Sequence, residues 1–416
     1  MIIVYKHNIL AQNILEITIE QAEKQFLEKN LQLLAERCNI SIDDAAIAQA
    51  KVLNNPTIGV SNINFWNPNA CNEVEVVPNS FGNQVIFSVE LEQMIRTAGK
   101  RKKLVNLEKV SKEIAIQEFE AFLLNLKTEL KIILHETVYL QSNLNIVNKQ
   151  QKINNNLVQI YKNQTAHGNI AKSELIRLQS SLIELESEVN EIRTELIKQY
   201  KEIKVLLNIN PGTEIVITAE TSVAVKNPDE ILLTDLLEMA KNSRPEFLLS
   251  DLNVKYHEKL LVYEKSQRSP DIALSLNYDR YGGVWKNFVG IGISLDIPVF
   301  NRNQGNIKMA KHFLEQSNFY AEEQKSRIQQ EVAEFYNSYK MNYLFYNKLM
   351  ENDFSEDLDN MLEVYTRNFL NRNINMLEYI DFMYAYKTTK QAMLMAKKNL
   401  DTSFAELQCS VNNEIK

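Results

Sequence analysis

The chain has 416 residues, of which only 10 are Gly and 8 are Pro, and its formal net charge is −7. So few turn-forming residues predict long helices rather than the many short elements of a globular enzyme. The negative charge argues against a nucleic-acid partner. The three cysteines lie far apart and contain no Cys-x-x-Cys pair, which argues against a disulfide framework or a zinc knuckle.

The chain divides into two halves with the same order of predicted elements, which indicates an internal duplication. Each half is expected to contain a helix, a β-hairpin and then a long helical hairpin. Residues 1–13 are compatible with either a signal-peptide remnant or a frayed helix start. The expected segments after them are a first repeat (14–208, with β-hairpin 56–93 and a helical tip near 164–171), a linker (209–227), a second repeat (228–412, with β-hairpin 270–299 and a tip near 368–375) and a tail (413–416).

In the first half, the pattern that predicts a β-hairpin is less regular than in the second. A helix is expected over about residues 16–53, followed by a weak strand over 57–66 and a loop rich in Asn and Pro. In the next strand the apolar side chains occupy every second position, at Val85, Phe87, Val89 and Leu91. A helix of about 70 residues follows and ends near residue 166.

The second half repeats this plan more clearly. A helix is expected over about residues 232–265, and a continuous helical stretch over 302–371. Between them, apolar side chains alternate with small or polar ones in two strands that flank a Gly-Gly turn, which is typical of a β-hairpin. The alternating apolar positions are Ile272, Leu274, Leu276 and Tyr278 in one strand, and Val289, Ile291, Ile293, Leu295 and Ile297 in the other.

Hairpins with one apolar and one polar face require an apolar medium on one side and water on the other. Strands of about 9–11 residues suit a tilted strand of a membrane β-barrel. Tyr278, Tyr281 and Trp285 near the turn suit its aromatic girdle. Four strands cannot close such a barrel, and an open edge in lipid leaves costly unpaired backbone groups. Three chains sharing one barrel of about twelve strands would solve this problem.

The long helices resemble coiled-coil helices, and each must reverse its direction once. Tyr161 begins a ten-residue segment that ends in Asn-Ile, and Tyr365 begins a second one 204 residues later (365 − 161). Gly168 can adopt a positive φ, and Asn169 or Asn373 can do so less easily. We therefore expect a tip turn at Gly168, Asn169 and Ile170, and another at Arg372, Asn373 and Ile374.

Acidic residues follow both expected tips. Glu174 lies in the first copy, and Glu378 and Asp381 lie three residues apart on one helix face in the second. Two interpretations are equally open. These carboxylates can complement the dipole at the start of a returning helix, or an oligomer can assemble them into a ring that binds cations and repels anions at a narrow aperture.

Several segments resemble the TolC family of outer-membrane efflux channels, over essentially the whole chain. They are "SPDIALSLNY", "VGIGISLDIPVF" and "GNIKMAK" around the second hairpin, and "HGNIAKSELI" and "RNINMLEYID" at the tips. The segment "LEQMIRTAGKRKKL" resembles the heavy-metal efflux branch, the CzcC/CusC type. The resemblance implies a homotrimer with a 12-stranded barrel in the outer membrane and a long α-helical barrel in the periplasm.

The same resemblance implies partners and roles. The tips would dock on a periplasmic adaptor (a membrane fusion protein) that joins an inner-membrane pump, and Glu174, Glu378 and Asp381 would form the periplasmic aperture, or gate. Arg372 stands where the family often has Gly, so that turn is expected to use Asn371 or Asn373. Many relatives have a signal peptide and an acylated Cys, neither of which is evident here; a native start upstream is therefore expected.

Other classes of protein have less support. We expect no enzyme, cofactor or metal site, because the chain has no P-loop or zinc-protease motif and its five His residues are scattered. The leading function is a passive exit channel for a tripartite efflux system, whose cargo includes heavy-metal cations if the branch is correct. The alternatives are a channel for type I protein secretion and a soluble coiled-coil scaffold.

Overall fold

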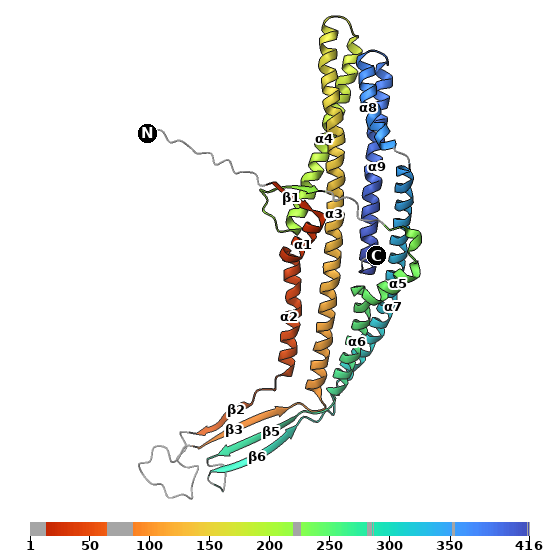
Figure 1. Cartoon of the computed structure of the whole chain (residues 1–416). Helices are drawn as coiled ribbons and strands as arrows, with labels where there is room; N and C mark the ends of the chain where they lie inside the picture. The colour runs from red at the N-terminus through yellow and green to blue at the C-terminus, as the bar shows by residue number, and fades with distance from the viewer. Residues whose placement is uncertain are drawn as a thin grey trace, which may run out of the picture. The chain divides into compact units, whose positions relative to one another are not determined.

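The computed structural model describes residues 14–64, 86–218, 226–280, 285, 287–351, 354–413 and 415. The structure is mainly helical (Figure 1). Their order is β1 (Ile14–Thr18), α1 (Ile19–Lys29), α2 (Leu31–Lys51), β2 (Thr57–Asn64), β3 (Ile86–Ile95), α3 (Lys100–Ala166), α4 (Lys172–Leu206), β4 (Glu214–Thr218), the 3-10 helix η1 (Pro228–Glu230), α5 (Leu233–Ser243), α6 (Pro245–Ser266), β5 (Ile272–Asp279), β6 (Phe288–Leu295), α7 (Gln304–Met350), α8 (Phe354–Leu370) and α9 (Met376–Val411).

The predicted fold class, mainly helical with four long strands, is confirmed. The order strand, strand, long helix and returning helix occurs as β2-β3-α3-α4 and again as β5-β6-α7-α8-α9. The helix expected over 302–371 differs in detail, because α7 ends at Met350 and α8 begins at Phe354. None of the described helices combines the length and the apolar character needed to cross a bilayer.

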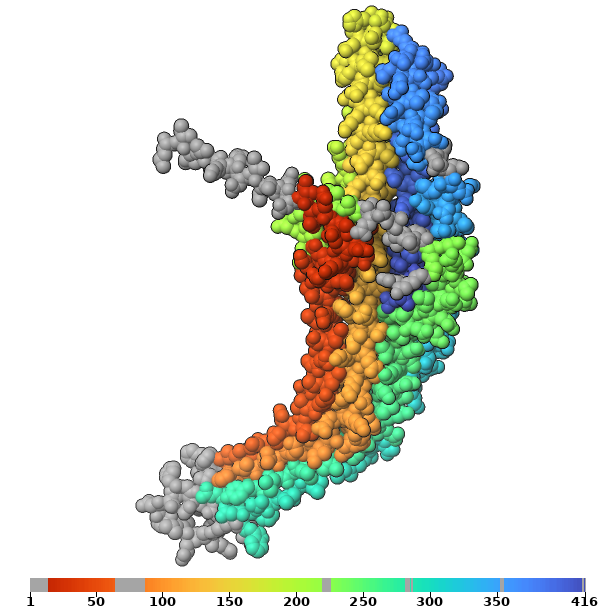
Figure 2. Space-filling model, in the orientation of Figure 1, coloured from red at the N-terminus to blue at the C-terminus, as the bar shows by residue number. Residues whose placement is uncertain are grey.

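The chain forms two compact units, each built from both halves of the sequence. Unit 1 comprises the described residues of 1–37, 117–248 and 324–416, and unit 2 those of 38–116 and 249–323. Unit 2 contains the sheet β2-β3-β5-β6, and all of its neighbouring strands are antiparallel. Figure 2 shows β2 and β3 alongside β5 and β6 as one continuous surface. The two hairpins therefore join through the β3–β5 pair.

The register of this sheet separates the apolar from the polar side chains. Leu91 is paired with Leu276, which in turn is paired with Ile291, so all three lie on one face. Glu90 is paired with Asn277 on the other face. The apolar face is uncovered in the single chain, with Ile291 84% and Ile293 69% exposed. The helices of unit 2 continue from one end of the sheet and do not cover this face (Figure 1).

At that end of the sheet, an ion pair of Lys100 links the sheet to the helix that follows β3. The Lys100 side chain is buried, and its Nζ lies 2.8 Å from Oδ1 of Asp271, which also accepts a 2.9 Å hydrogen bond from the Thr97 backbone N–H. Burial opposes ionisation of Asp271, but these two bonds outweigh it and lower the pKa of the carboxyl. The pair joins the start of α3 to the start of β5.

A second, smaller sheet in unit 1 was not predicted. β1 and β4 pair in parallel, from Ile14 with Glu214 to Thr18 with Thr218, where the sequence analysis placed a helix start and a linker. Ile17, Ile215 and Ile217 are buried in a core with residues of α1, α3 and α4. Five residues are too few to give a clear alternation, and tertiary packing decides their conformation.

Candidate functional site at the helical tips

The two helical hairpins of unit 1 reverse with the same hydrogen-bond pattern. In the first, the Asn169 N–H donates to the Gln164 carbonyl at 2.9 Å, and the Gly168 N–H donates to Thr165 at 3.0 Å. In the second, the corresponding bonds, 204 residues later, join Asn373 to Asn368 at 2.9 Å and Arg372 to Phe369 at 3.1 Å. Both pairs of bonds define a Schellman motif at a helix C-terminus. The repeated sequence therefore encodes one turn geometry twice.

The residue that takes the left-handed conformation differs between the copies. Gly168 has φ +75°, as expected, and Arg372 has φ +62°. The expectation that Asn371 or Asn373 would take this conformation in the second turn is wrong. The Schellman motif fixes the left-handed position by its hydrogen bonds, and Arg372 occupies that position although a side chain there is strained.

We expect Arg372→Gly to stabilise the second tip by about 1 kcal/mol and Gly168→Ala to destabilise the first by a similar amount. A Cβ on Gly168 would meet no atom within 4 Å, so the effect there is one of backbone conformation alone. Hydrogen exchange of the tip amides measures both changes. The amides of the second tip should exchange about fivefold more slowly in Arg372→Gly, and those of the first tip about fivefold faster in Gly168→Ala. A shift in the same direction in both variants would contradict this account.

The two tips pack against each other through aromatic rings. Tyr161 and Phe369 stack with centroids 5.4 Å apart, and Phe369 stacks on Tyr379 at 4.3 Å. Ile170 and Ile374 pack against the same cluster, and the tips lie side by side in Figure 1. Burial raises the pKa of Tyr379 to about 12. This aromatic cluster therefore holds together two tip turns that come from different halves of the chain.

The acidic residues beyond the tips have different environments. The Asn375 side chain accepts a 2.9 Å hydrogen bond from the Glu378 N–H, and the Glu378 carboxylate accepts one of 3.3 Å from the Asn375 N–H. This capping box gives Glu378 a structural role at the start of α9. Glu174 lies at the equivalent position of α4, but the N-cap there is Ala171 and makes no side-chain bond.

Ala171→Asn is therefore expected to complete a capping box with Glu174 and to stabilise the start of α4 by about 1 kcal/mol. Asn375→Ala is the matched change in the second copy, and we expect it to destabilise the start of α9 by the same amount. Amide exchange over the first turn of each helix measures both effects. Unchanged protection after Ala171→Asn would show that the backbone at this position does not allow the cap.

Asp381 and Arg177 occupy equivalent positions, 204 residues apart, and both are exposed. Asp381 lies on the same stripe of α9 as Leu377 and Tyr384, which are each 65% exposed. Within the described part of the chain, no ion pair includes Asp381, Glu378 or Glu174. None of the three carboxylates is therefore neutralised by a described cation, although Glu378 also accepts the capping bond from the Asn375 N–H.

Polar contacts between the two helical hairpins were missed by the sequence analysis. On α9, Lys387 lies 2.7 Å from Glu188 of α4, and the Gln391 side chain donates to Asn143 of α3 at 3.0 Å and to Glu188 at 2.7 Å. Asn143 is buried. The residues in each of these contacts are about 200 or more positions apart in the chain. A local sequence pattern cannot predict contacts over such a distance.

His167 and the aromatic residues near the second β-hairpin have simpler surroundings. His167 is exposed, and its Nδ1 lies 2.7 Å from the Asn163 carbonyl. The described residues contain no cluster of three or more His, Cys, Asp or Glu side chains that could hold a metal ion. Tyr278 donates a 2.9 Å hydrogen bond to the Asn287 side chain, and Trp285 is 73% exposed. Tyr281 lies outside the described residues.

Solved structures similar to this one cover nearly the whole chain. A membrane protein from Pseudomonas aeruginosa has a TM-score of 0.74 at 13% identity, covering 94% of this chain and 93% of that one. The outer membrane protein VceC from Vibrio cholerae has a TM-score of 0.72 at 14% identity, covering 96% and 97%. CusC, which forms a transmembrane channel, has a TM-score of 0.72 at 14% identity, covering 95% and 92%.

The chain has the fold of an outer-membrane channel. The resemblance to the TolC family is thus confirmed at the level of the fold. No protein family model matches the chain. Over 76 residues it is 30% identical to the cobalt-zinc-cadmium resistance protein CzcC of Cupriavidus metallidurans, and this segment spans 18% of each protein.

Proposed function

We propose that the protein is the outer-membrane exit channel of a tripartite efflux system. The observation that carries this proposal is the uncovered apolar face of the β2-β3-β5-β6 sheet. In water such a face would drive association or aggregation. In a bilayer it would meet hydrocarbon, while the face that carries Glu90 and Asn277 would meet water in the lumen.

The strand order supports a trimer. β2 and β6 are the two edges of the four-stranded sheet, and each has an unpaired side. Pairing β6 of one copy with β2 of the next removes both edges, as a sheet in lipid requires. Three copies of four strands close a 12-stranded barrel, which lies within the range of known membrane barrels.

The mass of the detergent-solubilised protein tests this assembly. Light scattering is expected to give three times the mass of one chain, with mainly helical circular dichroism. A homogeneous monomer that stays in solution in plain buffer would refute both the barrel and its membrane location, and would favour the coiled-coil scaffold.

The channel is proposed to be passive, with its helical part in the periplasm. The tips, with Gly168, Asn169 and Ile170 in one copy and Arg372 and Ile374 in the other, would dock on a periplasmic adaptor that is joined to an inner-membrane pump. Asn373, between Arg372 and Ile374, belongs to this proposed adaptor-docking surface. Tyr278, Tyr281 and Trp285 would lie at the membrane interface as an aromatic girdle.

Heavy-metal cations are the proposed cargo, and the segment similar to CzcC supports this choice. Deleting the gene should then sensitise the cell to divalent transition metals more than to organic antibiotics. The reverse order of sensitivity would reject metal cargo and leave the channel itself unaffected. Loss of a secreted protein with no change in sensitivity would favour type I secretion.

A further inference from the structure

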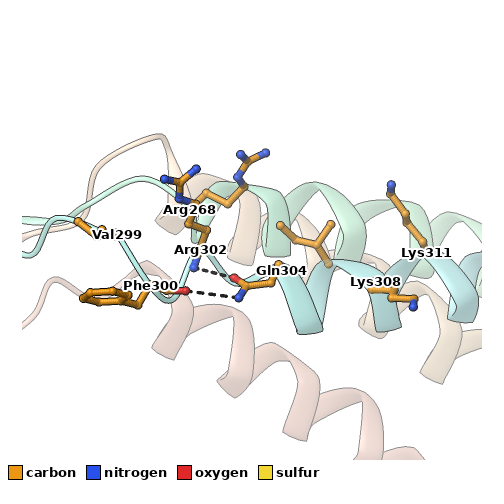
Figure 3. Close-up of a pocket in the computed structure, with 8 residues that line it drawn as sticks. Arg268, Val299, Phe300, Arg302, Gln304, Lys308 and Lys311 are labelled. Carbon is orange, nitrogen blue, oxygen red and sulfur yellow. Dashed lines mark hydrogen bonds between the residues drawn. The ribbon is translucent and has the colours of Figure 1, made fainter.

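A basic pocket of unit 2 lies where β6 leads into α7. Its volume is about 470 Å³, and its lining includes Arg268, Arg302, Lys308 and Lys311 (Figure 3). No acidic residue of the described chain lines it. None of these four cations has an ion pair within the described residues. The pocket therefore gathers four cationic side chains with no carboxylate in its lining.

The loop that forms the pocket is held in place by side-chain bonds. The Gln304 side chain accepts a 2.8 Å hydrogen bond from the Arg302 N–H and donates to the Phe300 carbonyl at 3.4 Å (Figure 3). Asn303 has φ +55° and donates to the Glu264 carboxylate at 2.6 Å. Glu264 is thus engaged outside the pocket. Helix α7, 47 residues long, begins at Gln304 without an acid in its first turn, so its free N–H groups add to the positive potential.

Apolar side chains lie directly beside these cations. Val299 and Phe300 line the pocket, and they are 56% and 94% exposed. Ile297, which is 71% exposed, continues the spacing of two residues from Ile293 to Val299. Exposed apolar side chains therefore lie beside the cations, just beyond the end of β6 at Leu295.

We propose that this pocket binds the phosphate of an anionic glycerophospholipid, whose acyl chains lie along Val299 and Phe300. The inference rests on the proposed placement of the sheet in a membrane. Clustered Lys and Arg at a membrane boundary attract anionic headgroups, and the adjacent apolar side chains favour a lipid over a free phosphate ion. At the equivalent corner of the first copy, by contrast, Lys100 is buried and paired with Asp271.

Native mass spectrometry of the detergent-solubilised assembly tests the site with phosphatidylglycerol and phosphatidylethanolamine of identical acyl chains. We expect phosphatidylglycerol to bind preferentially, and Lys308→Gln with Lys311→Gln to weaken its binding roughly 30-fold. Lys162→Gln with Lys172→Gln removes the same charge from exposed positions of unit 1 and should change nothing. Equal affinity for the two lipids, or an unchanged affinity in the pocket variant, would overturn the proposal.

Three further measurements separate a lipid ligand from a free phosphate ion and the pocket from membrane insertion. Inorganic phosphate in large excess should not displace phosphatidylglycerol, and Phe300→Ser should weaken lipid binding; displacement by phosphate would reject a lipid as the ligand. Flotation with vesicles of phosphatidylcholine alone tests membrane insertion in the absence of an anionic lipid that the pocket could bind. A protein that floats but shows no headgroup preference refutes only this site, whereas one that never floats refutes the proposed function.

Discussion

Ile293→Lys is expected to abolish stable assembly in a bilayer, and Ser294→Lys is expected to be tolerated. The two residues are neighbours on β6 but lie on opposite faces, because Ile293 is paired with Leu274 and Ser294 with Ala273. A lysine on the lipid face costs about 2–4 kcal/mol near the bilayer midplane. A trimer contains three copies of the substitution, so the cost is incurred three times in one barrel.

Refolding from urea into phospholipid vesicles measures this difference. The fraction that floats with the vesicles should fall sharply for Ile293→Lys and remain near the wild-type value for Ser294→Lys. The control variant carries the same charge one residue away, so a loss specific to Ile293 cannot come from charge alone. Equal insertion of both variants would show that hydrocarbon does not contact this face.

The sheet was the most predictable part of the fold, because alternation with a period of two is written directly in the sequence. In β5 and β6, the alternating apolar positions that the sequence predicted, from Ile272 to Tyr278 and from Val289 to Leu295, pair with one another on one face of the sheet. The β3–β5 pairing that joins the hairpins had no such signal. It depends on contacts such as that between Gln93 and Leu274, which are 181 residues apart (274 − 93).

The tips were predictable in position but less so in chemistry. The 204-residue offset places Arg372 opposite Gly168, and applying it strictly would have identified Arg372 as the left-handed residue. The Asn-x-x-Glu spacing from Asn375 to Glu378 is a readable capping box. The four cations of the basic pocket could not be grouped from sequence, since Arg268 and Arg302 are brought together only by the fold.

Neutralising the acids of the second tip is expected to weaken block of the channel by divalent cations. The capping box determines which substitution is informative at Glu378. Glu378→Ala would remove the negative charge and the capping bond together. Glu378→Gln removes the charge but keeps a side-chain oxygen that can accept the bond from the Asn375 N–H. Asp381→Asn removes the second charge from an exposed position without changing the size of the side chain.

In a trimer the double variant Glu378→Gln with Asp381→Asn removes six carboxylates from one aperture. Rings of acidic side chains attract cations and exclude anions, so we expect lower cation selectivity and at least about tenfold weaker divalent block, equivalent to about 1.4 kcal/mol. Single-channel recording in planar bilayers measures both quantities.

Asn375→Ala separates the charge of Glu378 from its structural role. This variant keeps all six acids and loses only the cap, so a fraying helix would change channel gating while leaving divalent affinity near the wild-type value. If divalent block weakens as much in Asn375→Ala as in the double variant, the ordered start of α9 controls the aperture and Glu378 acts only through its cap. If block is unchanged in the double variant, the acids do not line the aperture.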